Sequence, residues 1–207
     1  MISINPKEIP TSKLHGYLLG AVAPRPIAFA STIDEKGTPN LSPFSFFNVF
    51  GSNPPTMIFS PARRVRGNTT KHTLQNVEKI KEVVINVVNY DIVQQMSLSS
   101  SEYPEGVNEF EKAGFTMLAS DEVKPFRVAE SPVQFECKVT NVIYTGDQVG
   151  AGNLIVCEVL KIHIHKTVLD EDEMIDQHKI DLVARAGGSY YTRARDGFFE
   201  IPKPISP

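Results

Sequence analysis

Hydrophobic residues occur along the chain in short runs that alternate with turn-forming residues. The runs are rich in Val, Ile, Phe and Thr, which is typical of β-strands. They predict strands over residues 26–33, 56–60, 82–88, 133–144 and 154–166. The last two are long and are separated by a short loop that contains glycine, so we expect them to form one extended hairpin. Long antiparallel strands with frequent turns indicate a sandwich or a barrel.

Helical patterns are fewer and shorter. Residues 70–79 open with two threonines, of which Thr70 is the expected N-cap, and carry Leu74 and Val77 three positions apart. A second helix is expected over 91–99 with Asp91 as its cap, and a third, of a turn or two, over 108–113. The order is strands with inserted short helices, so we predict a mainly β fold and not a parallel doubly wound sheet.

One aromatic-rich stretch, NLSPFSFFNVFGSNPP at 40–55, follows neither a helical nor a strand period. Its four phenylalanines alternate with Ser, Asn, Pro and Gly. Flat rings and short polar groups together suit a planar ligand with polar edges, such as an isoalloxazine ring. The alternative is that the rings only pack in the core, and on this stretch alone core packing is the favoured interpretation.

A basic stretch, residues 59–76, leads from a predicted strand into the first predicted helix. It contains Arg63, Arg64, Arg66 and Lys71, with hydroxyl side chains among them. A helix N-terminus offers free N–H groups to an anion, so cations and hydroxyls at that point favour phosphate binding. An exposed basic loop is the alternative. The chain contains neither GxGxxG after a strand nor GxxxxGK[ST], so a phosphorylated cofactor would bind outside a Rossmann or P-loop framework.

These motifs together resemble a known family. The segment PRPIAFASTIDEKGTPNLSPFSFFN at 24–48, then PP, a strand that ends in Ser, KHT and a following Asn, is similar to the flavin reductase-like FMN-binding split-barrel family. That family includes flavin reductase components of two-component monooxygenases, such as nitrilotriacetate monooxygenase component B, and flavoredoxin-like electron carriers. The resemblance is strongest over 23–89 and continues more weakly to 184–193.

The resemblance implies a fold and a set of site residues. The fold is a six-stranded antiparallel Greek-key split barrel, one domain over 1–207 with its core at about 15–170 and a C-terminal extension at 185–207, in a homodimer that binds FMN near the subunit interface. The residues expected to line the flavin ring are Ser42, Ser45, Phe46, Phe47 and Asn48. Those expected at the phosphate are Ser60, Lys71 and Thr73, with His72 where many relatives carry an acid. Those expected to border the pocket are Arg25, Arg185, Gly187 and Gly188.

The implied activity is that of an NAD(P)H-dependent flavin reductase, with NADH or NADPH as hydride donor and a monooxygenase as one candidate acceptor. Two alternatives remain open: an FMN electron carrier and a non-catalytic flavin-binding module. FMN carries the redox chemistry, so no catalytic acid or base is required of the chain.

Composition narrows the class of protein. The 207 residues are 41% hydrophobic and 22% charged with a net charge of −3, which indicates a folded protein without a nucleic-acid role. No apolar run approaches the ~18 residues of a membrane span, and residues 1–10 do not resemble a signal peptide. We expect a cytoplasmic protein with Cys137 and Cys157 as reduced, buried thiols. His163 and His165 are expected to point outward from a strand and, with His178, to bind no metal.

Overall fold

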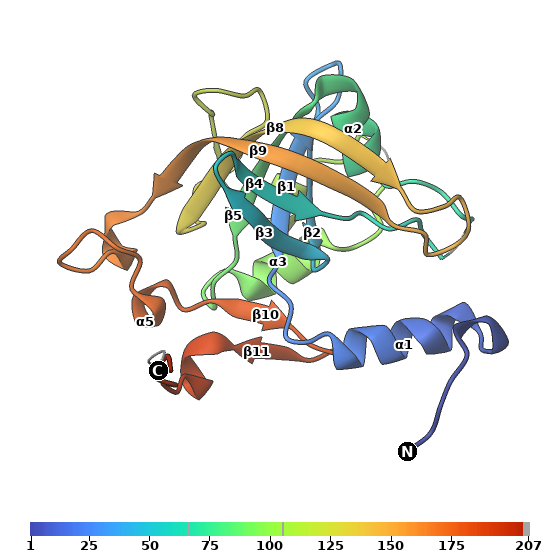
Figure 1. The fold of residues 1–207 in the computed structure, drawn as a ribbon. Helices are drawn as coiled ribbons and strands as arrows, with labels where there is room; N and C mark the ends of the chain where they lie inside the picture. Colours follow the sequence, from blue (N-terminus) through green and yellow to red (C-terminus); the bar gives the residue numbers. More distant parts are fainter. Residues whose placement is uncertain (66, 105, 205–207) are drawn as a thin grey trace.

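The computed structural model describes residues 1–65, 67–104 and 106–204, so Arg66 and the last three residues of the proline-containing tail, 205–207, lie outside the described part. Its centre is a seven-stranded antiparallel sheet in the order β2-β1-β5-β8-β9-β4-β3 (Figure 1). The strands are β1 (Ala28–Ile33), β2 (Pro39–Phe44), β3 (Phe47–Ser52), β4 (Pro55–Phe59), β5 (Glu82–Val87), β8 (Val133–Tyr144) and β9 (Asn153–Ile164).

Smaller elements surround this sheet. Two short ladders pair β6 (Met117–Leu118) with β7 (Arg127–Val128), and β10 (Val183–Arg185) with β11 (Tyr191–Arg193). The helices are α1 (Thr11–Ala21), α2 (His72–Ile80), α3 (Val93–Ser99), α4 (Glu109–Ala113) and α5 (Gln177–Ile180), with 3-10 turns η1 (Pro6–Glu8), η2 (Lys166–Val168) and η3 (Ala194–Gly197). No described helix has the length and apolarity that a membrane crossing requires. The expected mainly β fold with short helices is confirmed.

The five predicted strands are all present, and β8 and β9 form the predicted long hairpin. The count of six strands that the resemblance implied is wrong, because the sheet has seven. The hydrophobic pattern missed β2 and β3, which lie in the aromatic-rich stretch. Pro39 and Pro43 cannot donate to a ladder, which suits the edge position of β2. An extra residue, Phe50, bulges between Val49 and Gly51, and this breaks the two-residue alternation of β3.

The sheet is strongly curled but not closed. β2 and β3 stand at opposite ends of the strand order, yet only Ser45 and Phe46 separate them in the chain. Two residues cannot span a flat seven-stranded sheet, since neighbouring strands are about 4.8 Å apart. The two edges must therefore come close together, although no ladder joins β2 to β3 in the described part of the chain.

The three predicted helices are present, but both predicted caps are wrong. The N-cap of α2 is Lys71 and that of α3 is Ile92, and neither side chain makes a capping bond. Thr70 Oγ1 instead accepts a hydrogen bond from Gln75 Nε2 at 2.9 Å. Helix α1 was not predicted, since it buries none of its residues and carries two glycines, so it lacks an apolar stripe.

Strand β1 separates two hydrophobic cores. Ala28 and Ala30 face the interior of the curled sheet, where Phe59 and Leu74 are fully buried and α2 closes one end. Phe29 points to the other side, into a core formed with α3 and α4. All six residues of β1 are buried for this reason, and small residues inside leave room for the aromatic rings of neighbouring strands.

Both cysteines are free thiols inside the barrel, as expected. Burial raises the pKa of Cys157 to about 12. It also raises that of Cys137, with the neighbouring Cys157 as a smaller cause. The thiols are therefore protonated and unreactive at neutral pH.

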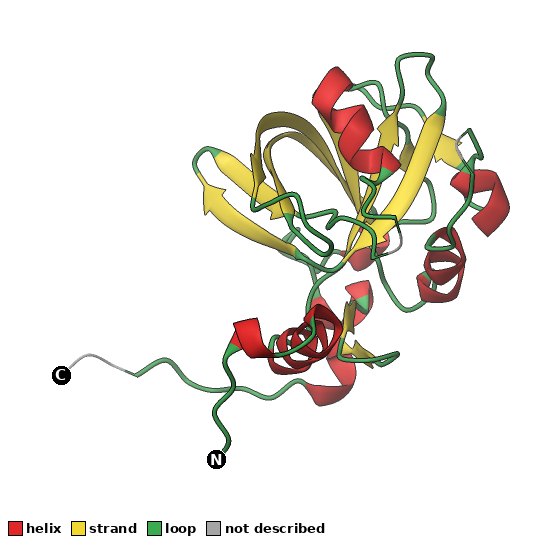
Figure 2. Ribbon diagram, turned by 90° about the vertical axis from the view of Figure 1, so that its right-hand side faces the viewer, coloured by secondary structure: helices red, strands yellow, loops and turns green. Residues whose placement is uncertain are grey.

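A second layer lies beneath the barrel, where α1 runs beside β10 and β11 (Figures 1 and 2). The buried Arg25 fastens this layer, because its guanidinium donates to the carbonyl oxygens of Leu19 (2.8 Å) and Val22 at the end of α1. Gly187 lies so close to Gly20 of α1 that a Cβ there would stand 3.3 Å from the Gly20 Cα. A side chain at this position would need α1 to move away by a few tenths of an ångström, so glycine suits the close approach.

The expectation of two outward histidines on β9 is wrong for His163. Its Nε2 lies 2.6 Å from Oε1 of Glu136, a carboxylate with no exposed surface, whereas Ile162 and Ile164 are 51% and 39% exposed. The buried charge on β8 draws the imidazole inward, because it requires polar partners.

Glu136 anchors the segment before β7 to the barrel. Its carboxylate accepts hydrogen bonds from the backbone N–H groups of Asp121 (2.9 Å), Glu122 (2.6 Å) and Val123 (3.2 Å). Burial alone would raise its pKa, but the amide donors and His163 together outweigh burial and lower the pKa below the usual carboxyl value. The charged form is thus the one that the fold stabilises.

Glu109 provides the contrast. This buried carboxyl at the start of α4 accepts one backbone bond, from Leu41 N–H at 3.0 Å, and so satisfies an N–H group on the free edge of β2. Burial raises its pKa, and the bonds from the backbone only partly oppose that shift. Folding therefore disfavours the charged form of Glu109, whereas it favours the charged form of Glu136.

We predict different effects on stability when each of these two buried glutamates is replaced by glutamine. Glu136→Gln should lower the free energy of unfolding at pH 7 by about 2–4 kcal/mol, because an amide cannot replace a carboxylate among four donors. Since the Glu136 pKa is lowered by folding, its contribution is complete above the ordinary carboxyl pKa and disappears as pH falls through the lowered value. The deficit of the variant should therefore shrink in acid.

Glu109→Gln is the matched control, and it should change stability by less than ~1 kcal/mol at pH 7, because the amide oxygen of glutamine can still accept the one bond from Leu41 N–H. Urea unfolding of both variants at pH 7 and at about pH 4 measures these effects. Equal losses for the two variants would contradict the prediction.

Candidate functional site

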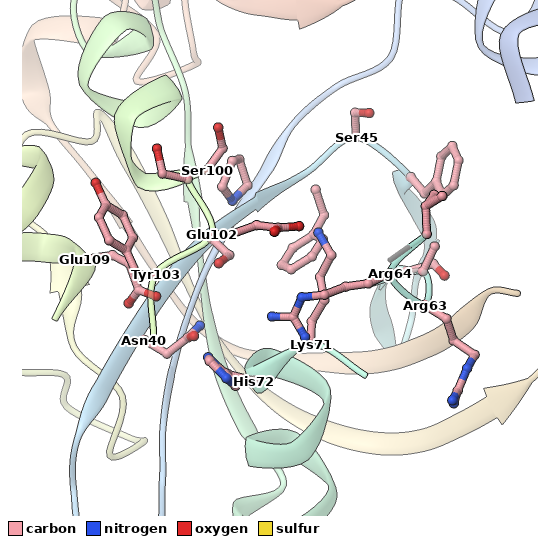
Figure 3. A pocket seen from close by; sticks show the side chains of 18 of the residues that line it. Asn40, Ser45, Arg63, Arg64, Lys71, His72, Ser100, Glu102, Tyr103 and Glu109 are labelled. Carbon is pink, nitrogen blue, oxygen red and sulfur yellow. The ribbon is translucent and has the colours of Figure 1, made fainter. Parts of the chain in front are cut away.

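A cavity of about 610 Å³, here called the main cavity, opens beside β2 (Figure 3). Four parts of the chain line it: α1, residues 40–46, residues 60–72 and residues 100–109. Helix α1 faces the barrel from the lower layer, and residues 40–46 run along the barrel edge. Residues 60–72 lead into α2, and residues 100–109 join α3 to α4. The site thus depends on contacts between segments that are far apart in the sequence.

Two cations meet at the α2 end of the main cavity. Figure 3 shows the side chains of Lys71 and Arg64 approaching each other there. Burial lowers the pKa of Lys71, and the positive charge of Arg64 lowers it further. Neither side chain forms an ion pair within 4.0 Å in the described part of the chain. Two like charges held together without a carboxylate partner favour an anionic ligand.

The backbone at the α2 end of the main cavity also favours an anionic ligand. Helix α2 begins at His72, directly after Lys71, so the N–H groups of His72 and Thr73 lack acceptors within the helix, whereas Leu74 N–H already donates to Lys71 O at 3.0 Å. The positive end of the helix dipole adds to the charge of Lys71. Ser60 also lines the cavity, where its Oγ accepts a hydrogen bond from Asn153 N–H at 3.0 Å and keeps its own hydroxyl hydrogen to donate.

The barrel edge supplies an aromatic and polar wall. Phe44 is 5% exposed and packs on Phe59 of the core, with the two ring centres 5.6 Å apart and the rings tilted by 40°. Lys71 Nζ lies 5.2 Å from the centre of the Phe44 ring. Ser42, Ser45 and Phe46 line the same wall. Such a surface offers flat apolar contact with hydrogen-bonding groups at its rim.

The opposite wall is acidic and hydroxylic. Glu102 and Tyr103 come from the segment after α3, and Glu109 from the start of α4 (Figure 3). Ser100 and Ser101 add two hydroxyl groups. The cavity is therefore positive at the α2 end and negative at the α3–α4 side.

A smaller cavity of about 180 Å³ adjoins the main one and shares Pro43, Phe44, Ser45 and Ser100 with it. Arg185 lines this smaller cavity, with its guanidinium carbon 4.5 Å from the centre of the Tyr191 ring. The guanidinium also donates to the carbonyl oxygen of Gly188 at 2.7 Å. Contacts within the C-terminal hairpin formed by β10 and β11 therefore fix the orientation of the Arg185 guanidinium.

The structure gathers six of the predicted site residues around the main cavity: Ser42, Ser45, Phe46, Ser60, Lys71 and His72. Arg25 does not line it, but its Nε donates to Ser45 Oγ at 3.3 Å and so supports the wall from behind. Arg185 lines the smaller cavity, as described.

The remaining predicted residues lie elsewhere. Phe47 packs against the inner core and Asn48 is exposed on β3. Thr73 is buried, where its Oγ1 accepts a bond from Asn40 Nδ2 at 3.1 Å. Gly187 contacts α1 and Gly188 occupies a turn with φ of +59°. None of these five lines the main cavity as the structure describes it.

Several lining residues carried no signal in the sequence. His15 and Leu19 come from the unpredicted α1, and His15 meets the Phe46 ring edge-on at 6.4 Å. Glu102 and Glu109 are isolated polar residues whose neighbours form no motif. Only the folding of distant segments onto the β2 edge brings them to the cavity.

One cluster elsewhere has the residue types of a metal site: Asp121, Glu136 and His163, whose ligand atoms lie within 4.8 Å of one another. Lys161 Nζ already lies 2.8 Å from Asp121, and Arg127 Nε lies 3.8 Å from Glu136. With backbone donors on Glu136 as well, the acidic oxygens have partners without a metal. The cluster functions as a structural ion-pair network.

Comparison with known proteins gives a consistent result. The family model of the flavin reductase-like domain matches residues 20–188. An uncharacterized protein of Aquifex aeolicus is 40% identical over 188 residues, covering 91% of this chain and 93% of its own.

Two solved structures illustrate the similarity of the fold. Nitrilotriacetate monooxygenase component B of Bacillus cereus superposes with a TM-score of 0.88 at 24% identity, covering 100% of this chain and 98% of its own. Flavoredoxin of Desulfovibrio vulgaris (Miyazaki F) superposes with a TM-score of 0.73 at 18% identity, covering 89% and 93%. With the family model matching most of its length, the chain belongs to the flavin reductase-like domain family.

Proposed function

We propose that the protein is an FMN-binding oxidoreductase that acts as an NAD(P)H-dependent flavin reductase. The observation that carries this proposal is the pairing of Lys71 and Arg64 at the N-terminus of α2, at one end of a cavity whose wall is aromatic and polar. A volume of about 610 Å³ lies within the ~300–1,000 Å³ range of small-molecule sites.

The residues present fit FMN at both ends. Lys71, Arg64, Ser60 and the first N–H groups of α2 would hold the phosphate, which needs cations and hydrogen-bond donors. The ring would lie against the wall formed by Ser42, Pro43, Phe44, Ser45 and Phe46. When bound there, FMN supplies the redox chemistry between NADH or NADPH and an electron acceptor.

The chain's own part is to bind, orient and shield. Phe44 is fixed by the core beneath it, so the apolar part of the wall is rigid before any ligand arrives. Arg25 holds Ser45 and α1 in place, which keeps the rim of the cavity in position. Arg185 and Tyr191 at the smaller cavity would contact the outer part of the ligand or the hydride donor.

The physiological setting is part of the proposal. Similarity to nitrilotriacetate monooxygenase component B supports a role as the reductase of a monooxygenase pair. A homodimer in the cytoplasm is the assembly and location that we propose with this role. Similarity to flavoredoxin supports an alternative, in which FMN stays bound and the protein carries electrons. The two roles differ in how tightly FMN is held, and a few kcal/mol separates them.

The first test is turnover. Purified protein with NADH or NADPH should oxidise the nucleotide at a rate that rises with added FMN and saturates. Absorbance at 340 nm measures the rate, and a protein-free sample is the control. FMN binding without nucleotide oxidation would favour the electron carrier, and absence of both would contradict the proposal.

The second test separates the phosphate end from the ring. Lys71→Met should weaken FMN binding about 10- to 100-fold, because a charge-assisted bond to the phosphate is lost. Riboflavin, which has no phosphate, should bind the variant and the wild type within about twofold of each other. Flavin fluorescence titration measures both affinities.

Lys166→Met removes an equal charge from an exposed turn outside both cavities and is the matched control, with no change expected. An equal loss of FMN and riboflavin affinity in Lys71→Met would place the phosphate elsewhere.

A further inference from the structure

Glu102 is a carboxylate that faces the cations of the main cavity. It is exposed, lies in the segment between α3 and α4, and lines the cavity. Figure 3 shows its side chain directed toward those of Lys71 and Arg64. It forms no ion pair within 4.0 Å with any described residue. One negative and two positive groups therefore share the cavity without direct contact.

The electrostatics confirm that these groups affect one another. Burial and Arg64 lower the pKa of Lys71, and Glu102 is the group that raises it. Among the described residues, the other charged or titratable groups around the main cavity are His15, Arg63, His72, Tyr103 and Glu109. Arg63 is turned away and bonded to Asn68, its Nε lying 2.8 Å from Oδ1 (Figure 3). Burial favours the neutral form of Glu109. Glu102 is thus the carboxylate positioned to compete for Lys71 and Arg64.

We propose that Glu102 is a specificity-determining residue that competes with the phosphate of a bound flavin for Lys71 and Arg64, and so limits the affinity for FMN. A phosphate carries a charge of about −1.5 to −2 at pH 7 and is repelled by a carboxylate on the same cavity. Riboflavin lacks that charge, so Glu102 does not affect its binding. The inference rests on the proposed FMN site. Because Glu102 lowers the affinity for FMN, bound FMN remains exchangeable.

Exposure limits the size of the effect. Water and salt screen a carboxylate on an open wall, so its contribution is modest compared with that of a buried charge. The effect must also shrink as ionic strength rises, since exposed charges are screened within about 10 Å at 0.1 M salt. Both features distinguish Glu102 from a residue that merely supports the cavity.

The test is Glu102→Gln, titrated with FMN and with riboflavin by flavin fluorescence. We expect FMN to bind roughly three- to tenfold more tightly and riboflavin to bind unchanged. The gain should diminish from low to high salt. Glu171→Gln makes the same charge change on an exposed turn outside the cavity and should alter neither affinity. Because Glu102 is exposed, the substitution leaves the fold intact.

The pH dependence gives a second readout. FMN binding weakens as pH rises through the pKa of Lys71, and removing Glu102 lowers that pKa, so the weakening should begin at lower pH in Glu102→Gln. Equal FMN affinities in variant and wild type would overturn the role of Glu102 while leaving the site. Tighter binding of both flavins would overturn it as well, because the effect would not act through phosphate. A wild type that binds neither flavin would overturn the proposed function itself.

Discussion

The short link between β2 and β3 is the constraint on which the rest of the molecule depends. Ser45 and Phe46 join the two ends of the strand order, so the sheet has to curl until its edges meet at this point. The link is then fixed on both sides: Ser45 Oγ accepts from Arg25 Nε, and Phe46 O accepts from Ser60 N at 2.9 Å. The main cavity opens where the curl leaves the edge of β2 without a strand partner, beside the start of α2.

The sequence predicted the parts of the fold that follow a regular period. The long runs 133–144 and 154–166 are rich in β-forming residues, and they located β8 to the residue and β9 within two residues at each end. The hydrophobic pattern failed where the backbone is irregular, at Pro43 in β2 and at the Phe50 bulge in β3. The phenylalanines of this stretch differ in their surroundings: Phe44 and Phe47 pack in or against the core, while Phe46 lines the main cavity and Phe50 is 70% exposed.

The residues that line the main cavity also divide into those that the sequence predicted and those that it did not. Ser42, Ser45, Ser60 and Lys71 were predictable because each lies in a continuous motif that the chain folds directly onto the cavity. Glu102 and His15 were not, because they reach it through long-range packing of α1 and of the α3–α4 segment on the barrel edge. Gly187 shows how a motif residue can act through the scaffold, since its missing side chain lets α1 approach the C-terminal hairpin, and the carbonyl oxygen of Ala186 beside it accepts from Arg25 Nη2 at 3.3 Å.

Lys71 connects the fold to the chemistry. Its ammonium group lies over the Phe44 ring and beside Arg64, and both burial and like charge disfavour its ionised form. A fold that only needed a stable surface would give this group a carboxylate at contact distance, as it gives Arg193 the carboxylate of Asp181 at 2.6 Å. In the protein without ligand the ionised form of Lys71 is instead poorly stabilised. Glu102 is close enough to raise the pKa of Lys71 but forms no ion pair with it. In the proposed site, the phosphate of FMN would stabilise the ionised form of Lys71, so the cost of holding this group charged without a ligand would become part of the affinity for FMN.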